Sequence, residues 1–300
     1  MENILSGAPR RRKKLNKAHI LIFVLLLLYT VFLFLPFYVV IITSFVSDIE
    51  LLSSMSFIWW PKEGLSIEAY RRLFAEDVYM ASGVLSMPSL LVGFLNSLWT
   101  TLFNVLCALF FGGLAAYSYS KVKFAGKNKL FMAQLATMMI PTACMTIPSY
   151  VFYDAIGWTY TFLPLIIPGM FGSATMIFFL RSYFDQVSDE YVEAAKIDGL
   201  GNFGIYVNVM MPIGIPAFVA QFIFAFVSGY NNYTGPLMYL YGGDPATYTL
   251  QIMLSDLRDF YSSEAVQCAT AIAALLPLVV VYAFTQKLFI EGIAVGGVKG

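Results

Sequence analysis

One stretch of the chain carries residues suited to docking rather than to catalysis. Glu193, Ala194 and Ala195 follow one another inside the longest polar loop, residues 182–211. The two alanines give a smooth surface that allows close approach, and the carboxylate can pair with one basic group on a partner. These residues predict a knob that enters a groove on another protein. The alternative interpretation is a hairpin that faces only solvent.

The residues that an enzyme would need do not occur together in this sequence. A phosphate-binding loop requires G-x-x-x-x-G-K-[ST], and Gly126-Lys127 lacks both the upstream glycine and the following hydroxyl. A hydrolase would need a Ser, His or Asp constellation or metal ligands, and the one histidine, His19, stands at the edge of an apolar run. We therefore expect no catalytic residue, no cofactor and no metal. Any ATP hydrolysis is expected on another chain.

The elements that position these residues are expected to be helices that cross a membrane. Hydrophobic residues make up 59% of the chain and charged residues only 12%. Each span needs about 20 mostly apolar residues, and the windows without charge are long enough to hold one. The sequence predicts an all-α polytopic membrane protein with six transmembrane helices. The expected spans are 20–43, 92–118, 130–153, 160–181, 213–232 and 264–286.

The distribution of basic residues sets the orientation of these helices. Six spans with a cytoplasmic N-terminus place 14 of the 18 basic residues inside, because only Lys62, Arg71, Arg72 and Arg258 fall outside. Basic residues prefer the cytoplasmic side of a membrane. We therefore expect both termini in the cytoplasm, and an external cap with a short helix in segment 44–90.

The polar loop 182–211 is expected to form two short helices. Ser188 can accept a hydrogen bond from the free N–H groups at the start of the first helix. Gly199 can adopt the left-handed conformation that ends this helix. Asn202 can cap the second helix, and Pro212 is expected to begin the next span. The docking residues would then lie on a short, well-capped helix.

The same loop resembles a motif of a known protein family. Glu193-Ala194-Ala195, followed by Asp198-Gly199 and Met211-Pro212, is similar to the EAA loop of binding-protein-dependent ABC importer permeases. Asn96-Ser97-Leu98, at the opening of the second span, also resembles carbohydrate permeases of this family. The ending from Gly292 to Gly300 is similar to that of the smaller permease subunit of maltose transporters. The chain thus resembles a carbohydrate ABC importer permease subunit.

This resemblance implies a type I ABC importer permease fold in a bacterial cytoplasmic membrane. The implied partners are a second permease in a heterodimer, two ATP-binding ATPase subunits, an extracellular solute-binding lipoprotein and the carbohydrate substrate, with no nucleic acid. The EAA helix would sit in a groove on one ATPase. The implied ATPase-coupling residues are Glu193, Ala194, Ala195, Asp198 and Gly199. The implied ATPase-contacting tail residues are Gly296, Gly297, Val298, Lys299 and Gly300.

The resemblance also implies one membrane domain with cytoplasmic extensions. Residues 1–18 would form a basic cytoplasmic N-terminal tail, and residues 19–300 a single transmembrane permease domain. Within that domain, loop 182–211 would be the coupling loop and residues 287–300 the cytoplasmic C-terminal tail.

Residues for substrate contact are expected among the aromatic and polar residues of the spans. Sugars bind through aromatic stacking and hydrogen bonds, although interface anchoring and bonds between helices are alternative roles for such residues. Sugar permeases often carry an acid near the end of the fifth span, and the stretch 230–233 lacks it. A non-sugar solute such as a polyamine therefore stays open, as does a different class, an ion-coupled carrier or a membrane scaffold. The candidates for substrate contact are Tyr150, Tyr153, Asn231, Asn232 and Tyr233.

Overall fold

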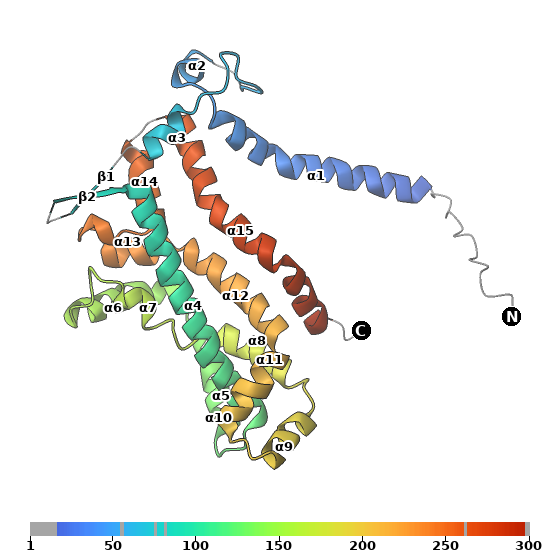
Figure 1. Cartoon of the computed structure of the whole chain (residues 1–300). Helices are drawn as coiled ribbons and strands as arrows, with labels where there is room; N and C mark the ends of the chain where they lie inside the picture. The colour runs from blue at the N-terminus through green and yellow to red at the C-terminus, as the bar shows by residue number, and fades with distance from the viewer. Residues whose placement is uncertain (1–16, 55–56, 75–76, 81–82, 261–262, 298–300) are drawn as a thin grey trace.

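Apolar helices dominate the computed structural model. It describes residues 17–54, 57–74, 77–80, 83–260 and 263–297. Most of the predicted basic tail therefore lies outside the described residues. Figure 1 shows a bundle of helices arranged along one long central helix, while another helix, α1, leaves the bundle.

The central helix is α4, which spans Ser89–Lys121. Its 33 residues contain no proline, so the backbone hydrogen-bond ladder is not interrupted by a missing N–H. It packs against α8 (Ala174–Phe184), α12 (Ile215–Tyr230) and α14 (Leu250–Phe260). Helix α15 (Glu264–Gly297) in turn packs on α12. These five helices supply many of the buried core residues.

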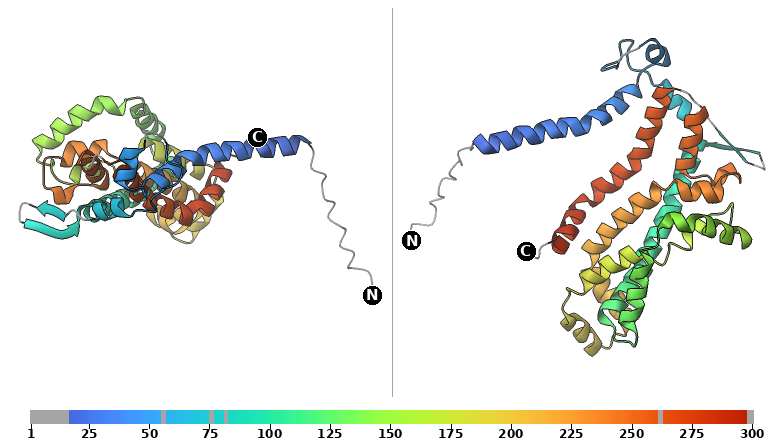
Figure 2. Two further views of the ribbon diagram at one scale, coloured as in Figure 1. Left: turned by 90° about the horizontal axis from the view of Figure 1, so that it is seen from above. Right: turned by 180° about the vertical axis from the view of Figure 1, so that it is seen from behind.

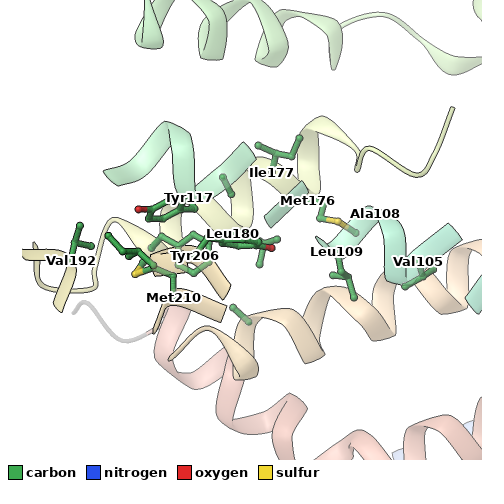
Figure 3. Packing of buried hydrophobic residues seen from close by; sticks show 14 of the residues in the cluster. Val105, Ala108, Leu109, Tyr117, Met176, Ile177, Leu180, Val192, Tyr206 and Met210 are labelled. Atoms are coloured by element: carbon green, nitrogen blue, oxygen red, sulfur yellow. The ribbon is translucent and has the colours of Figure 1, made fainter. Parts of the chain in front are cut away.

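The core consists of clusters at different heights along α4. Toward the C-terminal end of α4, Tyr117, Leu180 and Tyr206 are at most 1% exposed and belong to one cluster (Figure 3). Toward its N-terminal end, Phe226 and Leu250 belong to a second cluster. Apolar packing therefore holds α4 to its neighbours along most of its length.

A two-stranded hairpin, which the sequence analysis did not predict, precedes α4. Strands β1 (Asp77–Met80) and β2 (Gly83–Pro88) pair antiparallel. Valine and tyrosine in these strands favour extended backbone. The predicted external cap 44–90 also contains α2 (Asp48–Ser53) and α3 (Glu68–Leu73), so it has two short helices and a hairpin rather than one helix.

A break at Pro141 divides the predicted span 130–153. The structure divides it into α5 (Lys127–Thr137) and α6 (Thr142–Ala155), which are bent by 94° relative to each other. Pro141 occupies the N-cap of α6 in an extended conformation, because proline cannot donate to the helical ladder of the preceding turn. Hydropathy alone did not reveal this break.

A second bend, of 81°, separates the helical run Asn202–Ile213 from α12. This run corrects two expectations for the polar loop. Gly201 rather than Asn202 holds the N-cap position, and no side chain caps this helix. Pro212 lies inside the run, so the following span begins at Ile215. The parts of the run are α10 (Asn202–Ile205), a π-helical turn (Tyr206–Met210) and α11 (Met211–Ile213).

The predicted span 160–181 is not one continuous helix. Helix α7 (Leu163–Ile166) and α8 are separated by a segment that contains Pro168, and Ser173 caps α8 by accepting a hydrogen bond from the Met176 N–H. By length and composition, three described helices can cross a membrane: α1, α4 and α15. The number rises to five if each bent pair is one span, so the described helices do not establish the predicted six.

Helix α1 (Lys17–Thr43) projects away from the bundle, as Figures 1 and 2 show. Its apolar side chains are exposed along most of its length; Phe32, for example, is 71% exposed. Its contacts within the chain include α15. Apolar surface of this extent is typical of a site that faces lipid or another protein.

Polar contacts, some of them buried, hold the external cap together. Glu50 is 5% exposed and accepts a hydrogen bond from the Lys62 N–H at 2.9 Å. Asp48 pairs with Arg72 and accepts a hydrogen bond from Ser263, just before α15. Burial raises the pKa of Asp48, but the Ser263 hydrogen bond and the Arg72 guanidinium together lower it further, so this pKa lies below its ordinary value. These contacts fix α2 and α3 to the start of α15.

Candidate functional site

Helix α9 (Asp189–Ile197) carries the predicted docking residues. Ser188 caps it as predicted, because the Ser188 hydroxyl accepts a hydrogen bond from the Glu190 N–H at 3.3 Å. Gly199 follows the helix with a φ of 85°, the left-handed conformation that glycine adopts without steric cost. Figure 1 places α9 at the end of the molecule opposite α2.

The two faces of α9 differ in exposure. Val192 and Ala195 are 4% and 5% exposed and belong to the buried cluster that Figure 3 shows. Glu193 and Ala194 are exposed. Ala195 therefore packs inside this chain, whereas the sequence analysis placed it on one docking surface with Ala194. The face open to a partner holds Glu193 and Ala194.

Large apolar side chains border this open face. Tyr191, Ile197 and Phe203 are 56%, 87% and 58% exposed, and Asp198 and Gly199 are also exposed between them. Large apolar side chains that stay exposed close to one another are typical of protein interaction sites, and Tyr191 and Ile197 share the short helix α9. These three residues were not predicted from the sequence, although an isoleucine in the last turn of a polar helix was a usable signal.

Two residues at the end of α4 hold the linker that leads into α9. Lys121 Nζ donates hydrogen bonds to the Val187 carbonyl and to Asp189 Oδ1, both at 2.6 Å. Ser120 Oγ donates to Asp185 Oδ1 at 2.6 Å. The hydrogen bond and charge of Lys121 hold the pKa of Asp189 below its ordinary value. Both polar contacts and burial therefore fix α9 to the rest of the chain.

Two of the five predicted substrate residues join one aromatic cluster. Tyr150 and Tyr153 lie on α6 and are half-buried. The Tyr150 ring stacks on Tyr239 of α13 (Thr234–Leu240), with centroids 6.4 Å apart. Tyr153 stacks on Trp158 at 5.7 Å and meets Tyr239 edge to face. These rings therefore already contact other rings of the same chain.

The other three predicted substrate residues follow α12 and face different surroundings. Asn231 is exposed. Asn232 Oδ1 accepts a hydrogen bond from the Gly235 N–H at 3.1 Å, and its residue lines a polar cavity. Tyr233 Oη lies 3.3 Å from Ser255 Oγ of α14. The structure therefore does not bring the five predicted residues together in one site.

The cavity beside Asn232 has a volume of about 170 Å³, and every residue that lines it is uncharged. Thr249 is 4% exposed, and its hydroxyl has no hydrogen-bond partner among the described residues. Leaving a buried hydroxyl unpaired is costly, so the cavity suits water or another neutral hydroxyl-bearing molecule. The polar residues that line it are Ser97, Thr100, Thr101, Asn104, Asn232 and Thr249.

The predicted C-terminal tail is only partly described. Gly296 and Gly297 end α15, while Val298, Lys299 and Gly300 lie outside the described residues. Across the described part of the chain, no group of three or more His, Cys, Asp or Glu residues could hold a metal ion.

Comparison with known proteins places most of the chain in one family. Residues 108–295 match the family described as binding-protein-dependent transport system inner membrane component. The chain is 32% identical over 208 residues to the arabinooligosaccharides transport system permease protein AraQ of Bacillus subtilis (strain 168), which covers 69% of this chain and 73% of that protein. It is 28% identical over 296 residues to the polygalacturonan/rhamnogalacturonan transport system permease protein YtcP of the same strain, which covers 93% of this chain and 97% of that protein.

A solved structure shares the fold over nearly the whole chain. It belongs to a bacterial ABC transporter involved in the import of the acidic polysaccharide alginate, and the TM-score is 0.77. The match covers 91% of this chain and 96% of that chain at 23% sequence identity. This likeness shows that the arrangement of helices is the one seen in a transporter chain.

Proposed function

The chain belongs to the family of binding-protein-dependent transport system inner membrane components. We propose that it is the permease subunit of an ATP-driven importer that moves a sugar or oligosaccharide into the cytoplasm. Family membership sets aside the ion-coupled carrier and the scaffold. The names of the two relatives, which refer to arabinooligosaccharides and to polygalacturonan and rhamnogalacturonan, support a carbohydrate substrate. The uncharged cavity lining favours a neutral solute over a polyamine, whose site would need acids.

The observation that carries the proposal is the division of α9 into a buried and an exposed face. Val192 and Ala195 fasten the helix to the permease, and Glu193 and Ala194 are free to enter a groove on an ATPase subunit. A carboxylate in such a groove loses water and must gain a partner, and the arginine fork matches a carboxylate in shape. The exposed ring of Tyr191 would add apolar contact at the rim of the groove.

The proposed assembly contains two permeases in a heterodimer, two ATPase subunits and an extracellular solute-binding lipoprotein. This chain would be a type I permease with six spans in a bacterial cytoplasmic membrane and with both termini in the cytoplasm. The exposed apolar surface of α1 supports contact with lipid or with the second permease. The tail Gly296–Gly300 would contact the ATPases, and ATP hydrolysis would occur only on those subunits.

Charge reversal at Glu193 tests the coupling role. In the Glu193→Lys variant, the new ammonium would face the arginine of the groove, and breaking one side of a desolvated ion pair costs about 3–5 kcal/mol. We expect most of the ATPase to be lost from the purified complex and sugar uptake to fall with it. Co-purification of the ATPase and uptake of labelled sugar measure the two effects.

Two further variants make this test specific. Lys129→Glu reverses an exposed charge at the same end of the molecule but on α5, and should leave both ATPase binding and uptake unchanged. Changing the groove arginine of the ATPase to glutamate should partly rescue Glu193→Lys. If Glu193→Lys alone retains its ATPase and imports sugar normally, α9 is not the coupling element.

A further inference from the structure

Helix α4 is tied at one end to a segment far along the chain. Asn96 Nδ2 donates hydrogen bonds to the carbonyls of Ala246 at 2.8 Å and Tyr248 at 2.9 Å. Ser97 Oγ accepts a hydrogen bond from the Leu250 N–H at 2.8 Å. The partners in all three bonds are backbone groups of one short stretch. A displacement of α4 would therefore act directly on that backbone.

That stretch, residues 245–250, is here named the outer segment. It begins with a 3₁₀-helical turn (Pro245–Thr247) and joins α13 to α14. Apolar burial reinforces its bonds, because Tyr248 is 8% exposed and clusters with Val92 of α4. The outer segment is therefore held to α4 by both hydrogen bonds and packing.

The other end of α4 is tied to the linker before α9. The side chain of Lys121 is only 7% exposed, and its ammonium is hydrogen-bonded to the Val187 carbonyl and to Asp189. Lys127 Nζ donates to the carbonyl of Ser120 at 2.8 Å, which satisfies one of the free carbonyls at the end of the helix. This end of α4 is therefore stabilised against fraying, and it is joined to α9.

Between the two tied ends, α4 is one uninterrupted helix. Lys121 lies 25 residues after Asn96, which at 1.5 Å per residue is about 38 Å of helix. No proline interrupts this stretch, whereas α1, α6 and α15 each contain one. A helix without a break is far less able to absorb a displacement of one end than a bent pair such as α5 and α6.

We propose that α4 is a rigid lever that transmits movement of α9 to the outer segment, with Lys121 and Asn96 as the positioning residues at its two ends. The proposal rests on the proposed function, because an ATPase is what would move α9. ATP binding in the cytoplasm would then change the exposure of the outer segment on the face that meets the solute-binding protein. Neither residue would touch substrate.

The test uses the complete importer with its ATPases and binding protein in lipid nanodiscs. A fluorophore on Pro245→Cys, an exposed position, reports on the outer segment after Cys107, Cys144 and Cys268 are changed to serine. Three quantities are measured: the ATP-dependent change in fluorescence, the sugar imported per ATP hydrolysed, and the ATPase bound.

We expect Lys121→Met and Asn96→Ala each to lower the fluorescence change and the sugar imported per ATP by at least about fivefold, the low end for coupling between distant sites. Bound ATPase should not change. The double variant should be no worse than the worse single variant, because either change already disconnects the same lever. Lys121→Arg should retain most of the coupling, because its guanidinium can reach the same two oxygens.

Ser118→Ala is the matched control, because among the described residues the Ser118 hydroxyl bonds only to the Leu114 carbonyl, within α4 itself. It should leave all three quantities unchanged. If Lys121→Met does not assemble, Asp189→Asn removes the charge partner alone and should cause a smaller loss of coupling. A normal fluorescence change in Lys121→Met or Asp189→Asn, or strictly additive effects of the two lever variants, would overturn the lever. Absence of bound ATPase in the unmodified protein would instead refute the proposed function.

Discussion

Gly113 sets how closely α4 can approach the elements beside it. A Cβ atom added at Gly113 would lie 2.5 Å from Tyr206 Oη and 2.6 Å from the Phe218 ring. Tyr206 is fully buried, and its hydroxyl donates to the Phe110 carbonyl at 2.7 Å, so this side chain has no room to withdraw. At Gly112, one residue earlier, the nearest atoms would be 3.4 Å from an added Cβ, which is ordinary contact.

We therefore expect opposite results from two neighbouring substitutions. Gly113→Ala should destabilise the protein by about 1–3 kcal/mol through overpacking. Gly112→Ala should leave stability unchanged or raise it slightly, because alanine favours the helix by about 0.8–1 kcal/mol over glycine. Thermal unfolding of the purified permease in detergent measures both. Equal melting temperatures for the two variants would contradict the close contact at Gly113.

Residues that act through their immediate neighbours were predictable from the sequence. Ser188 and Gly199 cap and end α9 as expected, because the groups that they serve lie within three residues of them. Ala195 was placed on the wrong face because its burial depends on Tyr206 and other residues that fold back from later in the chain. The Lys121 contact with Asp189 joins residues 68 positions apart, so no local sequence pattern predicts it.

At the scale of the element, α9 is a short helix that must satisfy two packing partners at once. Its inner face belongs to the permease core, and its outer face is free. Ala194→Leu should leave the stability of the permease unchanged but should reduce ATPase binding, because the added bulk blocks the groove. Ala195→Leu should instead lower the stability of the permease itself by about 1–3 kcal/mol, because the buried cluster has no room for it. Melting temperature without the ATPase, together with ATPase co-purification, separates the two effects, and a reversed pattern would exchange the two faces.

The bends and breaks of the longer helices were harder to predict than the positions of these helices in the sequence. Apolar windows located α1, α4, α12 and α15, because a span must be apolar over most of its length. Hydropathy does not measure direction, so it did not show the 94° bend at Pro141 or the interruption near Pro168. Proline was the available signal in both places, since it removes an N–H from the ladder.

At the scale of the whole molecule, α4 separates the outer segment from α9. Its 33 residues make a helix about 50 Å long, which exceeds the hydrocarbon core of about 30 Å. The outer segment is bound near its first turns, and α9 is bound at its last residue. These two regions must therefore emerge on different faces of the membrane if α4 crosses it. The count of basic residues predicts that the α9 face lies inside.

Cysteine labelling in intact cells tests this orientation. In a background without the three native cysteines, Asn128→Cys lies in the first turn of α5, beside Lys127, and Pro245→Cys lies in the outer segment; both positions are exposed in the structure. A thiol reagent that cannot cross membranes should label Pro245→Cys and spare Asn128→Cys, and both should react after the cells are opened. If Asn128→Cys alone were labelled in intact cells, the orientation of the protein would be the opposite of the predicted one. The Glu193 face of α9 would then lie on the side without ATP, where it could not meet an ATPase, whereas the contacts within the fold would still stand.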